Sequence, residues 1–204
     1  MPGGMGDDAG SGWNWIKETG LEVGGSLTFA RGASPKRVME AFGMNPANAF
    51  IAPASWQARS LPYPDWAETY PPEHPWIQVG TTGEWGFALD ESSGGFGDYE
   101  DEAAEALSAG TEAVLLTHTQ SIDTFRYYAD GTEVTAFEPL FAWERWGTDP
   151  DRFLPHMRAA KLRLDDDDDI RNPVIAALEM VTLALGIRLP REVALGPLLT
   201  VQRD

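Results

Sequence analysis

The sequence predicts an α+β fold: a single domain with an antiparallel-rich sheet, helices packed on one face of the sheet and a helical C-terminal part. Three observations predict it. Apolar residues alternate with polar ones in several short segments, which is typical of half-buried strands. The pair Asp130-Gly131 is favoured in two-residue hairpin turns, and signals for helix starts precede apolar segments in both halves of the chain.

The chain is long enough for one domain with its own core, because it has 204 residues, of which 43% are hydrophobic. Residues 1–12 show no apolar periodicity, so we expect a flexible leader before a domain that spans 13–204. Residues 26–30 fit a short strand. Ser34 and Pro35 then suit the N-cap and the first position of a short helix.

Residues 45–75 contain seven prolines, interspersed with tryptophan and tyrosine. Prolines remove backbone donors and prevent continuous regular structure. We interpret this segment as a packed cover over the core, and the alternative is a functional lid. After it, alternating apolar positions predict a hairpin with strands near 77–79 and 85–89. A helix from about 100 to 109 and a strand over 112–118 follow.

The hairpin around Asp130-Gly131 is the strongest local signal, with strands over 122–129 and 132–137. A two-residue turn sets the register of the strands that it joins. We therefore expect Tyr127 to lie opposite Val134 on the core side of the hairpin.

The C-terminal part is expected to be helical. We expect helices over 155–162, 172–185 and 190–195, the second of which starts at an Asn-Pro pair. Five adjacent aspartates at 165–169 repel one another and predict a solvated linker. The apolar tail 198–201 weakly favours a scaffold-like subunit within an oligomer.

Negative charge is concentrated in one part of the chain. The net charge is −17, and residues 60–125 contain 13 acidic residues and no lysine or arginine. This pattern disfavours binding to nucleic acid or to an anionic membrane, and it permits a basic protein partner. The simpler explanation is that acidic surfaces keep a protein soluble. The chain has no cysteine and no secretory signal, so we expect a cytoplasmic protein.

Common catalytic motifs do not occur in the sequence: it has no nucleophile elbow, phosphate loop or dinucleotide fingerprint. The three histidines lack a metal-ligand spacing, so we expect no metal and no cofactor. His118 could act as a general base if Asp123 oriented it, but we interpret it as a packed residue. Acidic pairs at 90–91 and 100–101 could divide into acid and base roles, yet their surroundings are too polar for us to expect burial.

Candidate binding residues combine arginine, a carboxylate and aromatic rings. Arg31 ends the first strand, Glu138 follows the hairpin, and Arg145 and Trp146 come shortly after it. An arginine here could clamp a carboxylate ligand or form a structural ion pair with Glu138. Trp66, from the proline-rich segment, completes this set.

Several short motifs occur together in one order along the chain. They are Phe29-Ala30-Arg31-Gly32, Leu107-Ser108-Ala109-Gly110-Thr111, Phe125-Xaa-Tyr127-Xaa-Xaa-Asp130-Gly131, Phe137-Glu138-Pro139-Leu140 and Arg145-Trp146-Gly147 followed by Asp149-Pro150. With them, the chain resembles an uncharacterised family of small proteins, found chiefly in actinobacteria, over about 13–199. The resemblance implies no established activity, cofactor or catalytic residue.

Two functions are therefore open, and the sequence does not decide whether the protein is an enzyme. The one we favour is a protein-interaction module, immunity-like or regulatory in role, whose acidic surface includes Asp98, Glu100, Asp101 and Glu102. The alternative is a small-molecule binder or enzyme with a pocket between the sheet and the proline-rich segment. Its polar anchors would be Arg31, Glu138 and Arg145.

Overall fold

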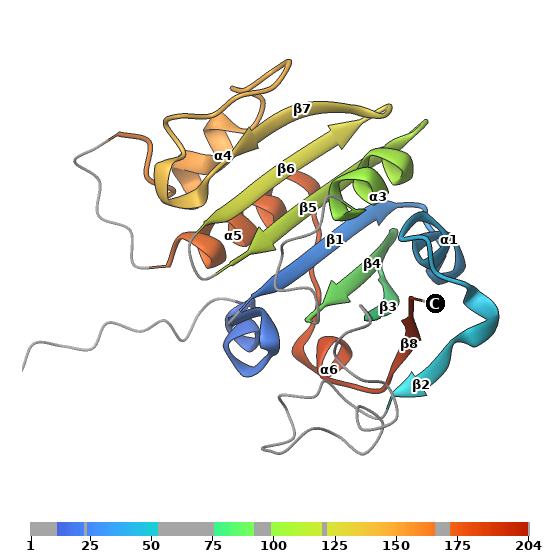
Figure 1. Ribbon diagram of the computed structural model, residues 1–204. Coiled ribbons are helices and arrows are strands. Elements are labelled where there is room, and N and C mark those ends of the chain that lie inside the picture. Colours follow the sequence, from blue (N-terminus) through green and yellow to red (C-terminus); the bar gives the residue numbers. More distant parts are fainter. Residues whose placement is uncertain are drawn as a thin grey trace, which may run out of the picture.

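The computed structural model describes residues 12–22, 24–52, 76–91, 99–119, 122–165 and 172–203. Within these ranges, eight strands form one antiparallel sheet in the order β2-β8-β3-β4-β1-β5-β6-β7 (Figure 1). The α+β class and the antiparallel sheet are thus confirmed. The strands are β1 (Gly25–Arg31), β2 (Phe50–Ala52), β3 (Trp76–Thr82), β4 (Trp85–Asp90), β5 (Glu112–His118), β6 (Asp123–Ala129), β7 (Thr132–Phe137) and β8 (Leu198–Gln202).

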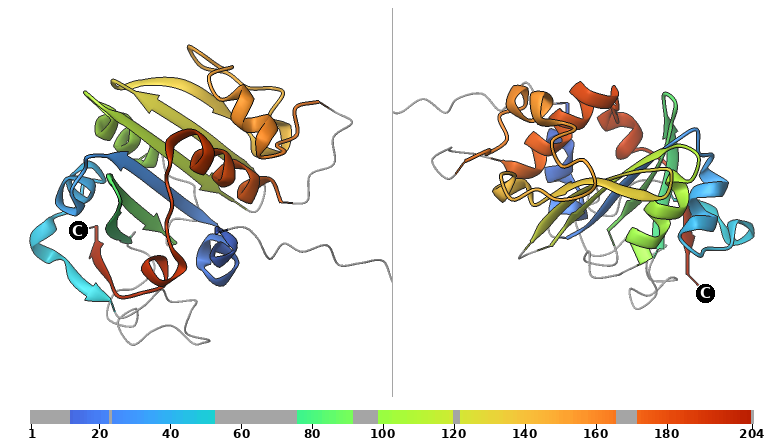
Figure 2. Two further views of the ribbon diagram at one scale, coloured as in Figure 1. Left: turned by 180° about the vertical axis from the view of Figure 1, so that it is seen from behind. Right: turned by 90° about the horizontal axis from the view of Figure 1, so that it is seen from above.

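Helices cover both faces of the sheet, whereas we expected them on one face (Figure 2). Helices α1 (Pro35–Ala41) and α3 (Tyr99–Ser108) pack on one face, called here the α3 side. Helices α4 (Leu154–Ala159), α5 (Pro173–Leu185) and α6 (Arg191–Ala194) lie on the other, the α5 side. The physical reason is that the central strands bury both of their faces, as the fully buried β4 shows.

The core on the α5 side is built from large side chains. Phe29 and Phe87 of the central strands are fully buried there, beneath Leu178 of α5. Trp13 and Trp15 close its edge from the 3-10 helix η1 (Asn14–Glu18) and the residue before it. The indole ring of Trp13 meets the ring of Phe29 edge-on, with centroids 6.0 Å apart.

The core on the α3 side is built from smaller side chains. Ala30, Ala88 and Ala113 of three neighbouring strands are buried against the two helices. Small side chains on the sheet allow a helix to approach closely, and Leu107 of α3 and Phe42 fill the space between the elements. The two helices therefore lie directly on the centre of the sheet.

Helix ends follow the local signals of the sequence. The Ser34 side chain accepts a hydrogen bond from the Arg37 backbone, and the Asn172 side chain accepts one from Ile175. Gly186 ends α5 in the left-handed conformation. These caps confirm the predicted starts of both helices.

The register of the β6–β7 hairpin differs from our prediction. Ala129 and Thr132 pair as expected, but a β-bulge between Tyr127 and Tyr128 places Tyr127 opposite Thr135 instead of Val134. One residue is thus inserted into β7. The reason lies outside the hairpin, in the loop at 146–149. The backbone N–H of Asp149 in this loop donates a hydrogen bond to the carbonyl of Val134, which is the inserted residue.

The apolar tail 198–201 belongs to the sheet and is not an exposed surface. It forms β8, which pairs with both β2 and β3, and Val201 is fully buried. The structure therefore removes the reason to expect an oligomer from this segment. Three predictions lie wholly or mostly outside the described residues: the leader, the proline-rich segment after residue 52, and the aspartate linker after residue 165.

The described helices were also compared with the length and hydropathy that a membrane span requires. None of them is both long and apolar enough to cross a bilayer.

Candidate functional site

Arg31, at the end of β1, forms ion pairs and a ring contact with residues other than the predicted site residues. Its Nε donates to Glu112 over 2.6 Å and its Nη1 donates to Glu84 over 2.7 Å. The guanidinium also lies 4.7 Å from the centre of the Trp85 ring. Tyr127 donates its hydroxyl to the other oxygen of Glu112 over 2.7 Å. Arg31 thus joins three strands and has no contact with Glu138.

Arg145 and Trp146 hold a loop against the sheet. The guanidinium of Arg145 pairs with Asp151 and donates to the carbonyl of Ala142. The backbone of Trp146 makes a bridge with Ala136 of β7, and 42% of the Trp146 side chain is exposed. Arg145 therefore has an ion-pair partner different from the one we considered, while the ring of Trp146 faces solvent.

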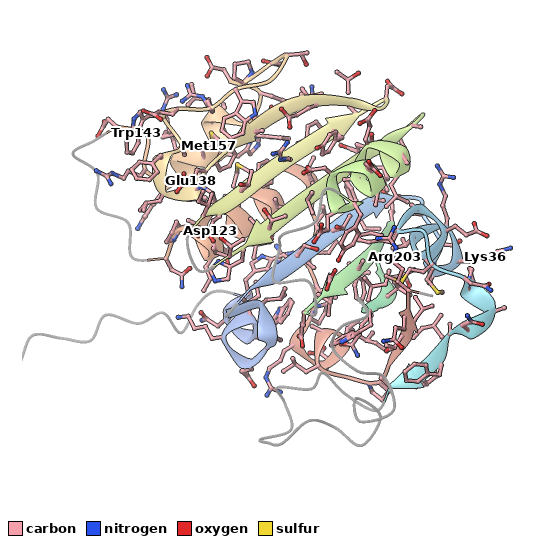
Figure 3. The ribbon with its side chains drawn as sticks, viewed as in Figure 1. Lys36, Asp123, Glu138, Trp143, Met157 and Arg203 are labelled. Carbon is pink, nitrogen blue, oxygen red and sulfur yellow. The ribbon has the colours of Figure 1, made fainter. Side chains whose placement is uncertain are left out.

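Glu138 lies at the opposite end of the sheet from Arg31, beside Asp123 (Figure 3). Partial burial raises the pKa of its carboxyl, and the nearby charges of Asp123 and Glu144 raise it further. The structure thus separates Arg31 from Glu138, so the three residues cannot anchor one ligand together. Trp66 lies outside the described residues.

The predicted acidic surface divides into buried and exposed members. Glu100 is fully buried, which contradicts its assignment to that surface. Asp101 accepts a hydrogen bond from Tyr128 over 2.9 Å and pairs with Arg126 at 3.2 Å. Glu102 is exposed, and Asp98 lies outside the described residues. The sequence did not predict the burial of Glu100, because the residues around it in the sequence are mostly polar. The burial results from the packing of α3 on the sheet.

Two fully buried carboxylates, those of Asp90 and Glu100, belong to a group of polar side chains on the α3 side of the sheet. Asp90 ends β4 and pairs across the strands with Ser26 of β1, so both side chains lie on this face. Thr28, two residues further along β1, lies on it as well. We call Ser26, Thr28, Asp90, Tyr99 and Glu100 the buried polar cluster.

Helix α3 brings the second carboxylate to this cluster. Glu100 precedes Ala103, Ala104 and Leu107 by three, four and seven residues, and all of them are buried. This spacing puts Glu100 on the sheet-facing side of the helix, one turn closer to its start. Tyr99 donates its hydroxyl to Asp90. The cluster is thus formed by two strands and the first turn of α3.

Two hydroxyl groups of the cluster have no hydrogen-bond partner among the residues that the structure describes. They are Oγ of Ser26 and Oγ1 of Thr28, and each side chain is only 1% exposed. Buried polar atoms are nearly always satisfied in folded proteins. Hydroxyls both donate and accept, whereas carboxylates accept, so the cluster offers more acceptors than donors.

The sequence contains a weak signal for this cluster. Ser26 and Thr28 alternate with Leu27 and Phe29, which places two polar side chains on one face of a strand. Only the packing of α3 against the sheet shows that this face is buried.

A histidine–carboxylate pair lies on the α5 side. Nδ1 of His118 contacts Oδ1 of Asp123, which is the pairing that a general base requires. His118 also lines a pocket of about 170 Å³ between residues 16–21 and the start of α5. Among the described residues, no group of three His, Asp or Glu side chains is arranged to hold a metal ion. Lys17 and Asn172 also line the pocket, but no serine, threonine or cysteine is among its described lining residues.

Comparison with known proteins places the chain in a family. A family model described as a family of unknown function (DUF6461) matches residues 9–194. No curated protein and no solved structure matches the chain. Because the matched residues include nearly all of the sheet and all of the described helices, the chain belongs to this family of unknown function.

Proposed function

We propose that the protein binds a small molecule that carries a positively charged, donor-rich group, and that the ligand occupies the buried polar cluster. One observation carries this proposal. Two fully buried carboxylates, Asp90 and Glu100, lie on the α3 side together with two buried hydroxyls, Ser26 and Thr28, that have no hydrogen-bond partner among the described residues. Binding of a small molecule was the alternative interpretation of the sequence, but the anchoring residues proposed there were Arg31, Glu138 and Arg145.

Burial of charge supports a ligand role for the cluster. Moving a carboxylate out of water costs several kcal/mol unless charge and hydrogen bonds compensate. Asp90 accepts a hydrogen bond from Tyr99. An ammonium or guanidinium group would compensate the negative charge of the two carboxylates, and hydroxyls beside it would pair with the oxygens of Ser26 and Thr28. The net charge of −17 attracts cations to the protein.

The proposal is tested by thermal-shift and calorimetric titrations with polyamines, agmatine and amino sugars. We expect a subset of these compounds to raise the Tm of the natural protein, because a ligand that binds only the folded state stabilises it. Asp90→Asn should abolish the shift while the Tm without ligand stays equal or rises. Glu105→Gln, an exposed acid on α3, is the matched control and should bind normally.

Two outcomes oppose the proposal. One is that no amine raises the Tm of the natural protein. The other is that the amines act equally on the natural protein and on the Asp90→Asn variant, which would show that they bind the acidic surface without specificity.

A second candidate is the protein-interaction module, immunity-like or regulatory in role, with a basic protein as its partner. It is favoured by the outer face of α3, where Glu102 and Glu105 are exposed and no basic residue lies in the helix. Changing both residues to lysine should release a basic partner captured from a lysate, and rising salt should have the same effect. Capture that is unchanged by both treatments would argue against it.

A further inference from the structure

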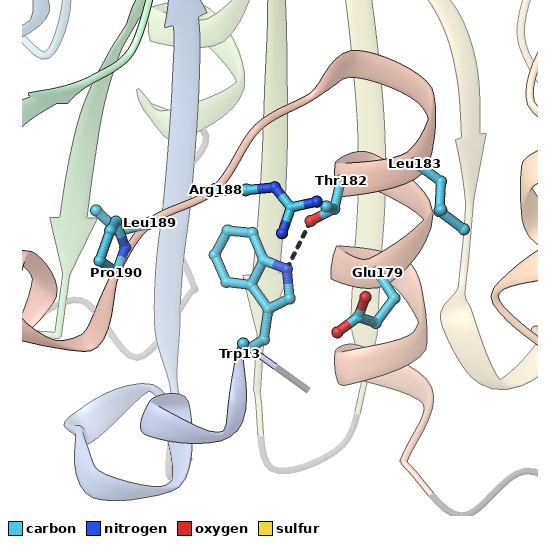
Figure 4. Close-up of a pocket in the computed structure, with 8 residues that line it drawn as sticks. Trp13, Glu179, Thr182, Leu183, Arg188, Leu189 and Pro190 are labelled. Atoms are coloured by element: carbon cyan, nitrogen blue, oxygen red, sulfur yellow. Dashed lines mark hydrogen bonds between the residues drawn. The ribbon is translucent and has the colours of Figure 1, made fainter. Parts of the chain in front are cut away.

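A second pocket lies on the α5 side, between the N-terminal segment and α5 (Figure 4). Its volume is about 310 Å³, which is the lower end of the range for sites of small ligands. It is far from the buried polar cluster, which lies on the opposite face of the sheet. Its lining consists of Gly12, Trp13, Glu179, Thr182, Leu183, Arg188, Leu189 and Pro190.

The walls of this pocket are held by hydrogen bonds. Trp13 donates its indole N–H to the hydroxyl of Thr182 over 2.9 Å, and Thr182 donates to the carbonyl of Ile187 over 2.9 Å. The indole of Trp15 donates to the carbonyl of Leu189 over 2.9 Å. Both indole groups are therefore satisfied inside the protein, and the pocket has its shape before any ligand binds.

Arg188 is unusual among the arginines of this acidic protein. In the part of the chain that the structure describes, two arginine side chains, Arg158 and Arg188, contact neither an oxygen acceptor nor an aromatic ring. Of these two, Arg188 lines this pocket and Arg158 does not. The arginines with such contacts are Arg31, Arg37, Arg126, Arg145, Arg152, Arg163, Arg191 and Arg203.

The backbone of Arg188 is held by its neighbours. Its carbonyl accepts a hydrogen bond from the Thr82 side chain, and the residues on either side, Ile187 and Leu189, are buried. The segment thus presents the guanidinium from a constant position. A guanidinium with free donors is the preferred partner of a carboxylate, because it can form two parallel hydrogen bonds.

The other lining residues give the pocket an acidic group and an apolar surface. Glu179 lines the same pocket, and no ion pair joins it to Arg188. Figure 4 shows both side chains pointing toward Trp13. Leu183, which is 52% exposed, and Pro190 supply apolar surface. The pocket therefore combines one positive group, one negative group and an apolar wall.

We infer that this pocket binds a free α-amino acid with an apolar side chain. Arg188 holds the carboxylate, Glu179 attracts the ammonium group, and the side chain lies on Leu183 and Pro190. The site is independent of the buried polar cluster, so the protein would respond to two different small molecules.

Calorimetry with the natural protein and three probes tests the inference. We expect L-phenylalanine to bind with a Kd of about 1 mM or lower, as suits a small open site. L-Phenylalaninamide lacks the carboxylate, and 3-phenylpropionate lacks the amine. Each should bind at least about tenfold more weakly, since each loses one charged contact. These comparisons need no variant and so do not depend on folding.

Matched variants assign the effect to Arg188. Arg188→Gln should weaken binding of L-phenylalanine at least about tenfold and remove the preference over the amide. Arg158→Gln alters the other arginine without such contacts, away from the pocket, and should bind normally. Asp90→Asn should also bind normally, which separates this site from the one proposed above.

Three results would overturn the inference. The first is absence of heat with L-phenylalanine and L-leucine at about 10 mM, because even a weak site is filled at that concentration. The second is equal affinity for the amide and the amino acid. The third is unchanged binding in Arg188→Gln.

Discussion

The backbone N–H of Asp149 donates a hydrogen bond of 2.8 Å to the carbonyl of Val134, the residue that the β-bulge inserts into β7. The adjacent Thr135 side chain donates to the carbonyl of Asp149 over 2.7 Å. The loop after the hairpin thus pairs with the edge strand at the bulge. It also covers part of an edge that would otherwise have open backbone groups.

Gly147 allows this loop to approach β7, and its replacement by alanine should destabilise the protein. The φ of Gly147 is +117°, and a Cβ there would lie 2.3 Å from the carbonyl oxygen of Val134. Backbone strain of this kind costs about 1–3 kcal/mol, and the steric overlap adds to it. Denaturant unfolding of Gly147→Ala should show a loss of at least that size.

Gly131→Ala is the matched control, because Gly131 also has a positive φ but a Cβ there would meet no neighbour. Its loss of unfolding free energy should be clearly smaller than that of Gly147→Ala. Equal losses in the two variants would show that the loop does not bind β7 closely.

Arg31 should contribute to stability through Glu112 and not through Glu84. The Glu112 side chain is 20% exposed, whereas that of Glu84 is 78% exposed and its ion pair is therefore largely screened by water. Glu112→Gln also alters the acceptor of the Tyr127 hydroxyl. We expect it to cost about 1–2 kcal/mol in urea unfolding, against a few tenths for Glu84→Gln. The reverse order would refute this account of Arg31.

Glu138→Gln should stabilise the protein at neutral pH. Burial, and then the charges of Asp123 and Glu144, raise the pKa of Glu138 in the folded state. A carboxyl with a raised pKa binds its proton more tightly when folded, so its contribution to stability is lost as pH rises from its ordinary pKa through the raised one. Tm measured from pH 3 to 8 should show a gain for the variant at pH 7 that disappears in acid.

The control for this experiment is Glu105→Gln, which removes an exposed carboxylate of α3. Its Tm difference from the natural protein should vary little with pH. If the gain of Glu138→Gln persisted unchanged at pH 3, ionisation of Glu138 would not be its cause.

Tyr127 should ionise later than an exposed tyrosine. Burial, followed by the hydrogen bond to Glu112, raises its pKa to about 12. The phenol therefore keeps its proton in the folded state, and stability falls as pH rises from about 10 toward 12. Tyrosinate absorbance should show a component near pH 12 that Tyr127→Phe lacks. A natural protein and variant with identical alkaline titrations would contradict this assignment.

Local chemistry explains why most elements were predictable from the sequence. The caps at Ser34 and Asn172 and the turn at Asp130-Gly131 are satisfied by residues within a few positions along the chain. The same holds for Gly186 at the end of α5. Such contacts do not depend on the rest of the fold.

The features of the fold that the sequence did not predict all depend on contacts between residues that are far apart in the sequence. The bulge in β7 depends on the loop at 146–149, and the tail at 198–201 becomes a strand because an open edge of β3 accepts it. The helices cover both faces because the central strands are buried on both. A strand pattern read alone does not show which neighbours will cover each of its faces.

The candidate sites likewise combine features that the sequence determined with features that depend on contacts between distant residues. The sequence by itself determined an acidic α+β chain without common catalytic motifs, because composition and short motifs do not change on folding. Only the tertiary structure decided that Asp90 and Glu100 are buried beside Ser26, and that Arg188 lines a pocket without an ion pair. The burial and pairing of a charge depend on side chains from distant elements, and these meet only when the sheet and its helices have formed.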